Sequence, residues 1–339
     1  MKRLKQVWQL RKVIVIPRGA ARLNVLAALI GAMAVGVLIL TFHVTPAGAG
    51  LDGSALSMPE LPVSSPSQTA SDAAGQAALS SLSAEELKRR IHREIHGSRL
   101  ALQLHIALLE VGKHRIENIP DYSATFLKQE RVDGDDLQEL QTIQLKMRHK
   151  PFGLYMKWLE GGDVGRQVLF SEGQYDDQVQ VKLGGKLSKV LPTLKLDPTG
   201  SMAMKESRHP VTEMGLLQLA ELVLQYRRRD LLHPQGVHWE MIPDQKFLDH
   251  VCDCWVVEYD NREVEKVYRK SITYIDRKYS LPICVKNFGW PAEGGDFADV
   301  AALDEATFIE YYGYTDIEIE TRLSDADFDK GNADYKFRR

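Results

Sequence analysis

The longest apolar segment of the chain lies near its N-terminus. Residues 23–44, LNVLAALIGAMAVGVLILTFHV, contain three polar side chains, those of Asn24, Thr41 and His43. A helix of this length is long enough to cross the hydrocarbon core of a bilayer. The pattern therefore predicts either a membrane-spanning anchor or the apolar part of a signal sequence.

The charges around this segment predict its orientation. Residues 1–22 carry seven lysines and arginines and no acid, and no base follows the segment nearby. The positive-inside rule leaves residues 1–22 in the cytoplasm and sends the rest of the chain across the membrane. We favour an uncleaved anchor because the basic and apolar parts are both longer than in a usual signal peptide. The alternative is cleavage near Ala49, at the small residues of Ala47-Gly48-Ala49.

A flexible linker is predicted over residues 45–83, and a folded domain over residues 84–339. The linker is rich in Pro, Gly, Ser and Ala and holds no aromatic residue, so it cannot bury a core. The domain opens with a predicted helix, for which Ser83 and Glu86 form a capping box and Gly97 is a candidate break. Its second half carries one apolar stripe, made of Leu100, Leu104, Leu108 and Val111.

From Asp121 the pattern changes to alternation with period 2, which is typical of half-buried strands. Nine strands are expected, at residues 121–132, 142–150, 152–158, 165–171, 177–183, 251–259, 267–275, 282–288 and 306–320. Short turns separate several of them, which favours antiparallel meanders. A second helix, predicted from Thr212 to Arg229, interrupts the strands. The order predicts an α+β fold, a curved antiparallel sheet with helices covering one face.

Four segments of the chain resemble known bacterial proteins. Two of them, YSATFLKQERVDGDDLQELQTIQLKMRHKPFGLYMKWL and SITYIDRKYSLPICVKNFGW, resemble strands of the LolA/LolB lipoprotein-carrier superfamily. The other two, SRHPVTEMGLLQLAELVL and the tail YYGYTDIEIETRLSDADFDKGNADYKF, resemble the family called domain of unknown function 1571. The resemblance covers roughly residues 121–337 and implies a half-barrel of antiparallel strands over an apolar cavity. It does not imply lipoprotein transport, since a fold does not fix a function.

The implied cavity would lie between the sheet and the second helix. Alternation places some large apolar side chains on one face of neighbouring strands, and the helix offers a facing stripe. The candidate cavity residues are Phe126, Leu145, Met147, Met156, Trp158, Leu217 and Val223. The alternative for each of them is an ordinary place in the core, since a sheet covered by helices must bury one face in either case.

Composition and charge narrow the classes of partner. The 339 residues are 44% hydrophobic and 26% charged, with a net charge of -3, which are values of a globular protein. Seven of the 43 bases precede residue 50, so the other 36 bases face all 46 acids and give the rest of the chain about -10. An acidic domain disfavours a nucleic-acid partner, which would require a basic surface.

Three patterns suggest metal or thiol chemistry, and each has a simpler explanation. His92 and His96 have the spacing of metal ligands on a helix, but no third ligand is indicated and a solvated helix face explains them better. Cys252 and Cys254 point to one side of a strand, and Cys284 lies two strands further, about 9.6 Å away, which is too far for a simple disulfide. Free thiols are therefore expected over a disulfide or a soft-metal site.

The acids that precede Gly331 resemble a calcium loop only superficially. An EF-hand starting at Asp325 would need Gly and Glu where Lys330 and Lys336 stand. Nucleophile elbows, P-loops, dinucleotide-binding motifs and recognisable triads are also absent from the sequence. We therefore expect no metal, no cofactor and no catalytic residue.

These observations predict a non-enzymatic, extracytoplasmic binding protein. It would be attached to the bacterial inner membrane by a single span, with its domain in the periplasm; after cleavage near Ala49 it would instead be a soluble periplasmic protein. The predicted partner is a lipid or another apolar or acylated ligand, held by hydrophobic transfer worth about 0.8 kcal/mol per CH₂. The alternative function is a structural or protein-interaction domain of the envelope with a filled core.

Overall fold

The computed structural model describes residue 86 and residues 94–132, 137–186 and 191–337. The chain divides into two compact units, and almost all of the described residues belong to the unit that contains residues 93–339. The predicted span at residues 23–44, the linker, Ser83 and His92 lie outside the described residues. Within the described part, each helix is too short or too polar to cross a bilayer.

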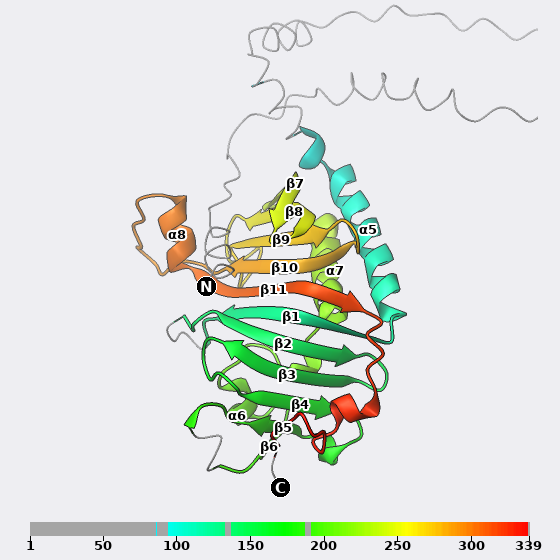
Figure 1. Ribbon diagram of the computed structural model, residues 1–339. Helices are drawn as coiled ribbons and strands as arrows, with labels where there is room; N and C mark the ends of the chain where they lie inside the picture. The colour runs from blue at the N-terminus through cyan, green and yellow to red at the C-terminus, as the bar shows by residue number, and fades with distance from the viewer. Residues whose placement is uncertain (1–85, 87–93, 133–136, 187–190, 338–339) are drawn as a thin grey trace, which may run out of the picture. The chain divides into compact units, whose positions relative to one another are not determined.

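The described unit is built on one antiparallel sheet of eleven strands (Figure 1). Their order across the sheet is β6-β5-β4-β3-β2-β1-β11-β10-β9-β8-β7. The strands are β1 (Asp121–Glu130), β2 (Gln141–Arg148), β3 (Gly153–Glu160), β4 (Gln167–Ser171), β5 (Val179–Lys182), β6 (Leu194–Leu196), β7 (Val237–Phe247), β8 (His250–Tyr259), β9 (Lys270–Asp276), β10 (Leu281–Phe288) and β11 (Phe308–Ile319). The predicted antiparallel α+β class is thus confirmed.

Two meanders make up this sheet, and the first and last strands join them. β1 to β6 form one meander and β7 to β11 the other, and β1 pairs with β11 along the seam. In this pairing Phe126 lies opposite Tyr314, and Glu130 lies opposite Glu310. The seam therefore brings residues about 180 positions apart in the sequence onto the same face of the sheet.

Nine strands match the prediction from alternation, whereas β6 and β7 were missed. β7 is an edge strand that contains Pro243, and its pairing with β8 shifts register between Ile242 and Gln245. Asp244 has a φ of 57° at this irregularity. Proline is tolerated at sheet edges and bulges because no ladder hydrogen bond is lost there.

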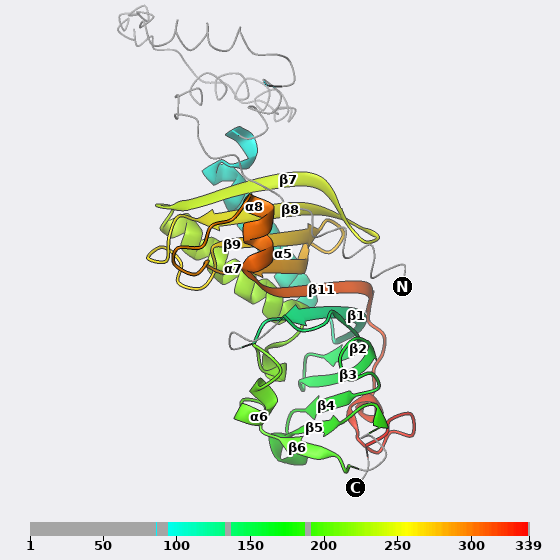
Figure 2. The ribbon, with the colours of Figure 1, turned by 90° about the vertical axis from the view of Figure 1, so that its left-hand side faces the viewer.

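Helices α5 (Arg99–Glu117) and α7 (Leu216–Leu232) pack against each other on one face of the sheet, against β10 (Figure 2). α5 begins after the predicted break at Gly97, and the Ser98 side chain caps it by accepting a hydrogen bond from the Ala101 N–H at 3.1 Å. The chain also forms a short helix, α8 (Val300–Ala306), and two helical turns, α6 (Ser201–Met204) and η3 (Val211–Glu213).

The apolar stripe predicted on α5 is exposed to solvent, with 53–64% of each side chain accessible. The helix packs through a different face, formed by Leu102, His105, Leu109, Gly112 and Ile116. Gly112 sits against the turn between β9 and β10, where an added Cβ would lie 2.0 Å from the Ser280 carbonyl oxygen. This close approach fixes which face of α5 is buried.

Helix α7 begins at Leu216, four residues after the predicted start at Thr212. Gly215, the residue directly before α7, has a φ of 114°, a conformation that L side chains rarely adopt. The predicted helix therefore cannot continue through it. The hydroxyl of Tyr122, from β1, accepts a hydrogen bond from the Leu216 N–H at 2.9 Å and so takes the place of a capping side chain. The start of α7 is therefore fixed by a contact from a distant strand, which local sequence does not show.

The opposite face of the sheet is covered by the C-terminal segment over β3 and β4. η4 (Asp325–Phe328) places the Phe328 ring beside Tyr155 and Leu169, and all three side chains are buried. The Tyr155 and Tyr335 rings stack with centroids 3.9 Å apart. The C-terminal segment thus covers the part of this face that β3 and β4 form.

Candidate functional site

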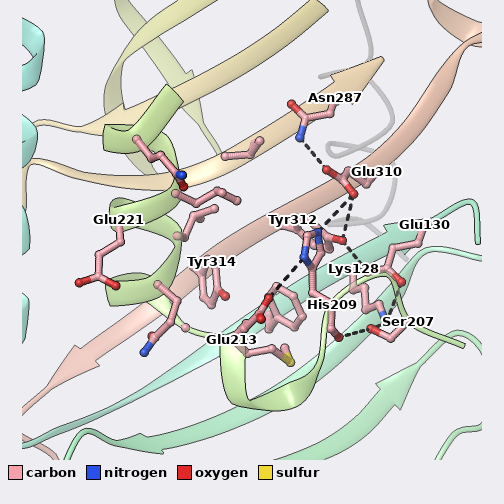
Figure 3. Close-up of a pocket in the computed structure, with 18 residues that line it drawn as sticks. Lys128, Glu130, Ser207, His209, Glu213, Glu221, Asn287, Glu310, Tyr312 and Tyr314 are labelled. Atoms are coloured by element: carbon pink, nitrogen blue, oxygen red, sulfur yellow. Dashed lines mark hydrogen bonds and ion pairs between the residues drawn. The ribbon is translucent and has the colours of Figure 1, made fainter. Parts of the chain in front are cut away.

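A cavity of about 390 Å³ lies between α7 and the sheet (Figure 3). Three strands, β1, β10 and β11, form one wall, and α7 with the segment before it forms the other. The side chains that line it are Phe126, Lys128, Glu130, Ser207, His209, Glu213, Met214, Gln218, Leu219, Glu221, Leu222, Gln225, Val285, Asn287, Glu310, Tyr312 and Tyr314, together with Gly215.

Apolar side chains line one part of the cavity. The Phe126 ring packs on Tyr314, with ring centroids 4.9 Å apart, and Val285 adds to the same wall from β10. Leu219 and Leu222 face them from α7, and Leu222 is 38% exposed at the opening. This part of the cavity can receive a hydrocarbon group without leaving a polar atom unpaired.

The other part of the cavity is polar and centres on the buried carboxylate of Glu310. Its Oε1 accepts hydrogen bonds of 2.7 Å from Tyr268 and Asn287, and its Oε2 lies 2.8 Å from the Arg208 Nε. Burial alone would raise the pKa of Glu310, but contacts with His209, Asn287 and Arg208 outweigh burial and lower the pKa to about 2. Glu310 is therefore a fixed anion at physiological pH.

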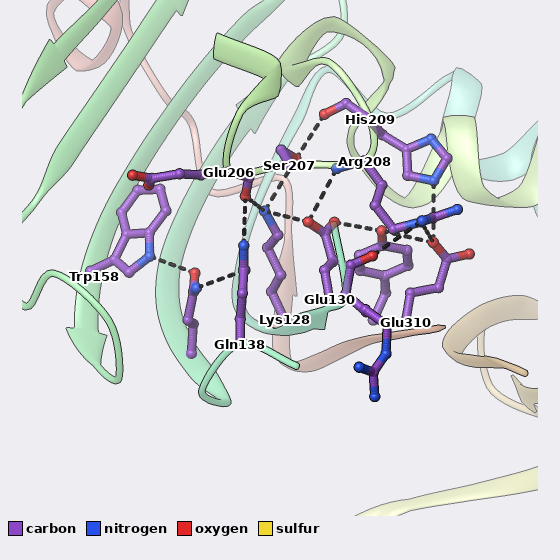
Figure 4. A network of polar contacts seen from close by, with 12 residues as sticks. Lys128, Glu130, Gln138, Trp158, Glu206, Ser207, Arg208, His209 and Glu310 are labelled. Carbon is purple, nitrogen blue, oxygen red and sulfur yellow. Dashed lines mark hydrogen bonds and ion pairs between the residues drawn. The ribbon is translucent and has the colours of Figure 1, made fainter. Parts of the chain in front are cut away.

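A second buried carboxylate, that of Glu130, binds the segment before α7 (Figure 4). Its Oε2 lies 3.0 Å from the Lys128 Nζ and accepts the Arg208 N–H at 3.2 Å, and its Oε1 accepts the Tyr312 hydroxyl. The Lys128 Nζ also donates to the Ser207 Oγ at 3.1 Å. Together Glu130 and Glu310 hold residues 206–209 against the sheet.

His209 lies between two carboxylates. Its Nε2 is 3.6 Å from the Glu310 Oε2, and its Nδ1 is 4.0 Å from the Glu213 Oε2. The interaction with Glu310 raises the pKa of His209 above 6.5, against the lowering effect of burial. The imidazole is therefore biased toward its charged form.

Two polar groups of the cavity, the Glu310 carboxylate and the Ser207 hydroxyl, are engaged in contacts within the protein. A general base works best with a pKa near the ambient pH, and the pKa of Glu310 is about 2. The Ser207 hydroxyl donates to the His209 carbonyl oxygen at 2.9 Å, so it is not aimed at the imidazole. The Ser207 oxygen also accepts from the Lys128 ammonium, which is itself paired with Glu130.

The structure places the predicted cavity residues partly in the cavity lining and partly in the core. Phe126 lines the cavity. The main core buries the other predicted residues of the sheet, which are Leu145, Met147, Met156 and Trp158, and also Val223 on α7. Leu217 packs against that core and is partly buried. Trp158 is among the buried ones and donates through its Nε1 to the Gln141 Oε1 at 2.8 Å.

Sequence reasoning missed the polar lining residues, although alternation could have indicated them. Lys128 and Glu130 follow Phe126 at intervals of two, so they share its face of β1. The same holds on β11 for Glu310, which precedes Tyr312 and Tyr314. Charges at the inward positions of a covered strand are unusual and point to a polar site. The two segments with the closer family resemblance contribute to this cavity, through Ser207 and His209 and through Tyr312 and Tyr314.

A second hollow, of about 490 Å³, lies at the turns joining β7 to β8 and β9 to β10. It is lined mainly by charged side chains, among them His250 and Asp276, whose Nδ1 and Oδ2 atoms lie 2.9 Å apart. Tyr279 and Ile317 also border it. It has no apolar wall comparable to that of the first cavity, so we treat the cavity beside α7 as the candidate site.

The structure describes the three cysteines and the C-terminal acids that the sequence offered for thiol or metal chemistry. The three cysteines, Cys252, Cys254 and Cys284, are buried free thiols. Burial raises the pKa of Cys254, on β8, to about 12, and it also raises the pKa of Cys284, on β10. Within the described residues we find no group of three or more metal-ligating side chains. Asp327 lies 2.7 Å from the Lys146 Nζ, and Asp325 pairs with Arg148, so both carboxylates have protein partners.

Known proteins resemble this chain in sequence or in fold. Solved structures with a similar chain course include a putative outer membrane lipoprotein-sorting protein domain from Vibrio parahaemolyticus, which is 13% identical with a TM-score of 0.31, over 68% of this chain and 97% of that one. A LolA superfamily protein from Nitrosomonas europaea is 10% identical with a TM-score of 0.28, over 66% and 96%. The Mycobacterium tuberculosis lipoprotein LppX is 8% identical with a TM-score of 0.37, over 66% and 98%.

The family assignment rests on the sequence. A search of curated proteins gave no match. Residues 119–337, which include every strand and the whole cavity lining, match the family described as Protein of unknown function (DUF1571). The predicted resemblance is confirmed, and the chain belongs to this family.

Proposed function

We propose that the domain is a non-enzymatic binding protein that holds a lipid or another acylated, apolar molecule between the sheet and α7. The observation that carries the proposal is the cavity of about 390 Å³ with its apolar wall. Small-molecule sites in proteins occupy roughly 300–1,000 Å³ and combine apolar walls with a few polar groups. A cavity near the lower end of this range suits one acyl chain with its head group.

Hydrophobic transfer would supply the binding free energy. Each buried CH₂ contributes about 0.8 kcal/mol, so eight methylenes against Phe126, Leu219 and Leu222 would contribute about 6 kcal/mol before the cost of ordering the chain. Binding of this strength is reversible, as a carrier or sensor requires. The fixed anion of Glu310, whose pKa is far from the ambient pH, supports a function in binding over one in catalysis.

The sequence supports an extracytoplasmic setting for this function. We propose that residues 23–44 anchor the protein in the inner membrane and that residues 45–83 connect this anchor to the domain. A lipid-binding domain held close to a bilayer would meet its ligand at high effective concentration. Recovery of the chain from the soluble periplasmic fraction, with a mature N-terminus near Ala49, would contradict the anchor.

The alternative is a structural or interaction domain of the envelope. One observation favours it: Leu145, Met147, Met156 and Trp158 all lie in a continuous packed core. The half of the sheet formed by β2 and β3 is thus filled by the protein's own side chains.

A pair of substitutions on α7 distinguishes the two functions. Leu222 lines the opening of the cavity, whereas Leu232 is 72% exposed on the same helix and outside the cavity. We expect Leu222→Trp to fill the opening and to weaken binding of the uncharged probe N-dodecyl dansylamide by about tenfold or more, which is about 1.4 kcal/mol. Leu232→Trp is the matched control and should leave the affinity unchanged.

The measurement is fluorescence titration of the full chain, purified in an amphipol, with a thermal melt of each variant. Both substitutions are at exposed positions and should change stability by less than about 0.5 kcal/mol. A wild-type protein that melts cooperatively and does not bind the probe would support the structural domain. Equal loss of binding in both variants would place the probe outside the cavity.

A further inference from the structure

We propose that the cavity selects amphiphiles with an uncharged or cationic head group and disfavours anionic ones such as fatty acids. This inference rests on the proposed binding function and specifies the chemical class of the ligand. Three features of the lining carry it: the pairing of its cations, the excess of its acids and an unpaired acceptor on α7.

The cations of the lining are already paired. Lys128 is the lining residue with a permanent positive charge, and its Nζ contacts the Glu130 Oε2 at 3.0 Å, the Ser207 Oγ at 3.1 Å and the Glu206 carbonyl oxygen at 3.3 Å. An ammonium group has three hydrogens to donate, and these three acceptors use them all. A carboxylate or phosphate could bind Lys128 only by displacing one of these buried contacts.

His209 is committed in the same way, and Arg208 through two of its three side-chain nitrogens. The two ring nitrogens of His209 face the carboxylates of Glu310 and Glu213. Arg208 lies beside the lining, and its Nε and Nη1 contact Glu310 and the Arg131 carbonyl oxygen, at 2.8 and 3.1 Å. The cations of the described lining, Lys128 and His209, are therefore already engaged with acceptors of the protein itself.

Acids outnumber bases in the lining. Four glutamates, Glu130, Glu213, Glu221 and Glu310, face Lys128 and His209. The two buried ones are neutralised by their contacts, but the Glu213 and Glu221 side chains are 65% and 50% exposed near the opening. Glu221 is 3.3 Å from the Lys113 Nζ, outside the lining, while the partner of Glu213 is the more distant His209. An anion approaching the opening would be repelled, and a cation attracted.

The helix also offers an acceptor. The Oε1 atom of Gln218 is buried at the cavity and has no hydrogen-bond partner in the described structure. Buried polar atoms are nearly always hydrogen-bonded in proteins, and an unpaired one costs free energy. An amine or hydroxyl of a ligand could donate to this atom, whereas a carboxylate could not.

The test compares three ligands that share a twelve-carbon chain. Dodecylamine, monolauroylglycerol and laurate would each displace N-dodecyl dansylamide from the full chain at pH 7.5 and low salt. We expect dodecylamine and monolauroylglycerol to bind at least about tenfold more tightly than laurate. Added salt should reduce the advantage of the amine, because the charges at the opening are exposed.

Variants assign the selectivity to the two exposed glutamates. The double substitution Glu213→Gln with Glu221→Gln should reduce the ratio of laurate to dodecylamine dissociation constants at least about threefold. The control replaces two exposed acids away from the cavity, Glu293→Gln with Glu305→Gln, and should leave the ratio unchanged.

The outcomes separate the inference from the proposed function. Laurate binding as tightly as the other two ligands would overturn the inference and leave the binding function intact. Failure of all three ligands and of the probe to bind would overturn both. An equal change of the ratio in the variant and in its control would overturn the assignment to Glu213 and Glu221.

Discussion

At the scale of single residues, the main feature of the cavity is a pair of buried carboxylates with many donors. Glu310 and Glu130 are both 1% exposed, and burying a charge is costly unless it is paired. The side chains of Tyr268, Asn287 and Arg208 donate to Glu310, and the Tyr312 hydroxyl donates to Glu130. Because its pKa is lowered from 4.5 to about 2, the stability that Glu310 contributes is present above pH 4.5 and is lost as the pH falls toward 2.

His209 predicts a pH dependence of opposite sign. Its folded pKa is raised above 6.5 by Glu310, so its contribution is complete below pH 6.5 and is lost as the pH rises through the folded pKa. We expect His209→Gln to cost about 1 kcal/mol at pH 5.5, a modest value because the side chain is 33% exposed. The cost should shrink toward pH 9.

The measurement is urea unfolding of wild type and variant at several pH values. His233→Gln, at an exposed position after α7, is the control and should show no such trend. A His209→Gln cost that grows with pH would contradict the ion pair with Glu310.

At the scale of elements, the sequence predicted what local pattern controls and missed what distant contacts control. Alternation located nine strands, and the helical period located both long helices. The first residue of α7 could not be predicted, because the Tyr122 hydroxyl that receives the Leu216 N–H comes from β1. We expected the cavity between the sheet and the second helix. Which side chains line it depends on the pairing of β1 with β11. That pairing joins the two ends of the domain, and periodicity carries no information on it.

Helix α5 offers a test of which of its two apolar faces is buried. Leu109 is 0% exposed, and Leu109→Ala should cost about 2–5 kcal/mol through lost burial and a new cavity. Leu104 is 58% exposed on the other face, and Leu104→Gln should change the stability by less than about 0.5 kcal/mol. Denaturant unfolding of the full chain checks both. A large cost for Leu104→Gln would show that the exposed stripe is covered in solution.

At the scale of the whole described unit, the two faces of the sheet have separate tasks. The face under α5 and α7 holds the cavity, while the C-terminal segment covers β3 and β4 on the opposite face. Successive residues of β3 show the division: Met156 points into the main core and Tyr155 into the cluster with Phe328. A substitution in the cluster with Phe328 can therefore change the stability without touching a residue of the cavity lining.

This separation predicts opposite behaviour for two substitutions. The Phe328 ring is 0% exposed and lies so close to Gly153 that an added Cβ there would be 2.8 Å from it. Phe328→Ala should therefore cost about 3–5 kcal/mol of stability and leave the affinity for N-dodecyl dansylamide unchanged at temperatures where the variant is folded. Leu222→Trp should do the reverse.

Thermal melts and probe titrations of the same two preparations measure both quantities. If Phe328→Ala leaves too little folded protein at 25 °C, the titration can be made at 10 °C, after circular dichroism shows a folded baseline. A probe affinity that falls with Phe328→Ala in the folded protein would mean that the two faces are coupled through the sheet. Tyr155 and Met156 are adjacent on β3, and Leu169 and Phe170 on β4, so the backbones of these two strands connect the Phe328 cluster to the main core.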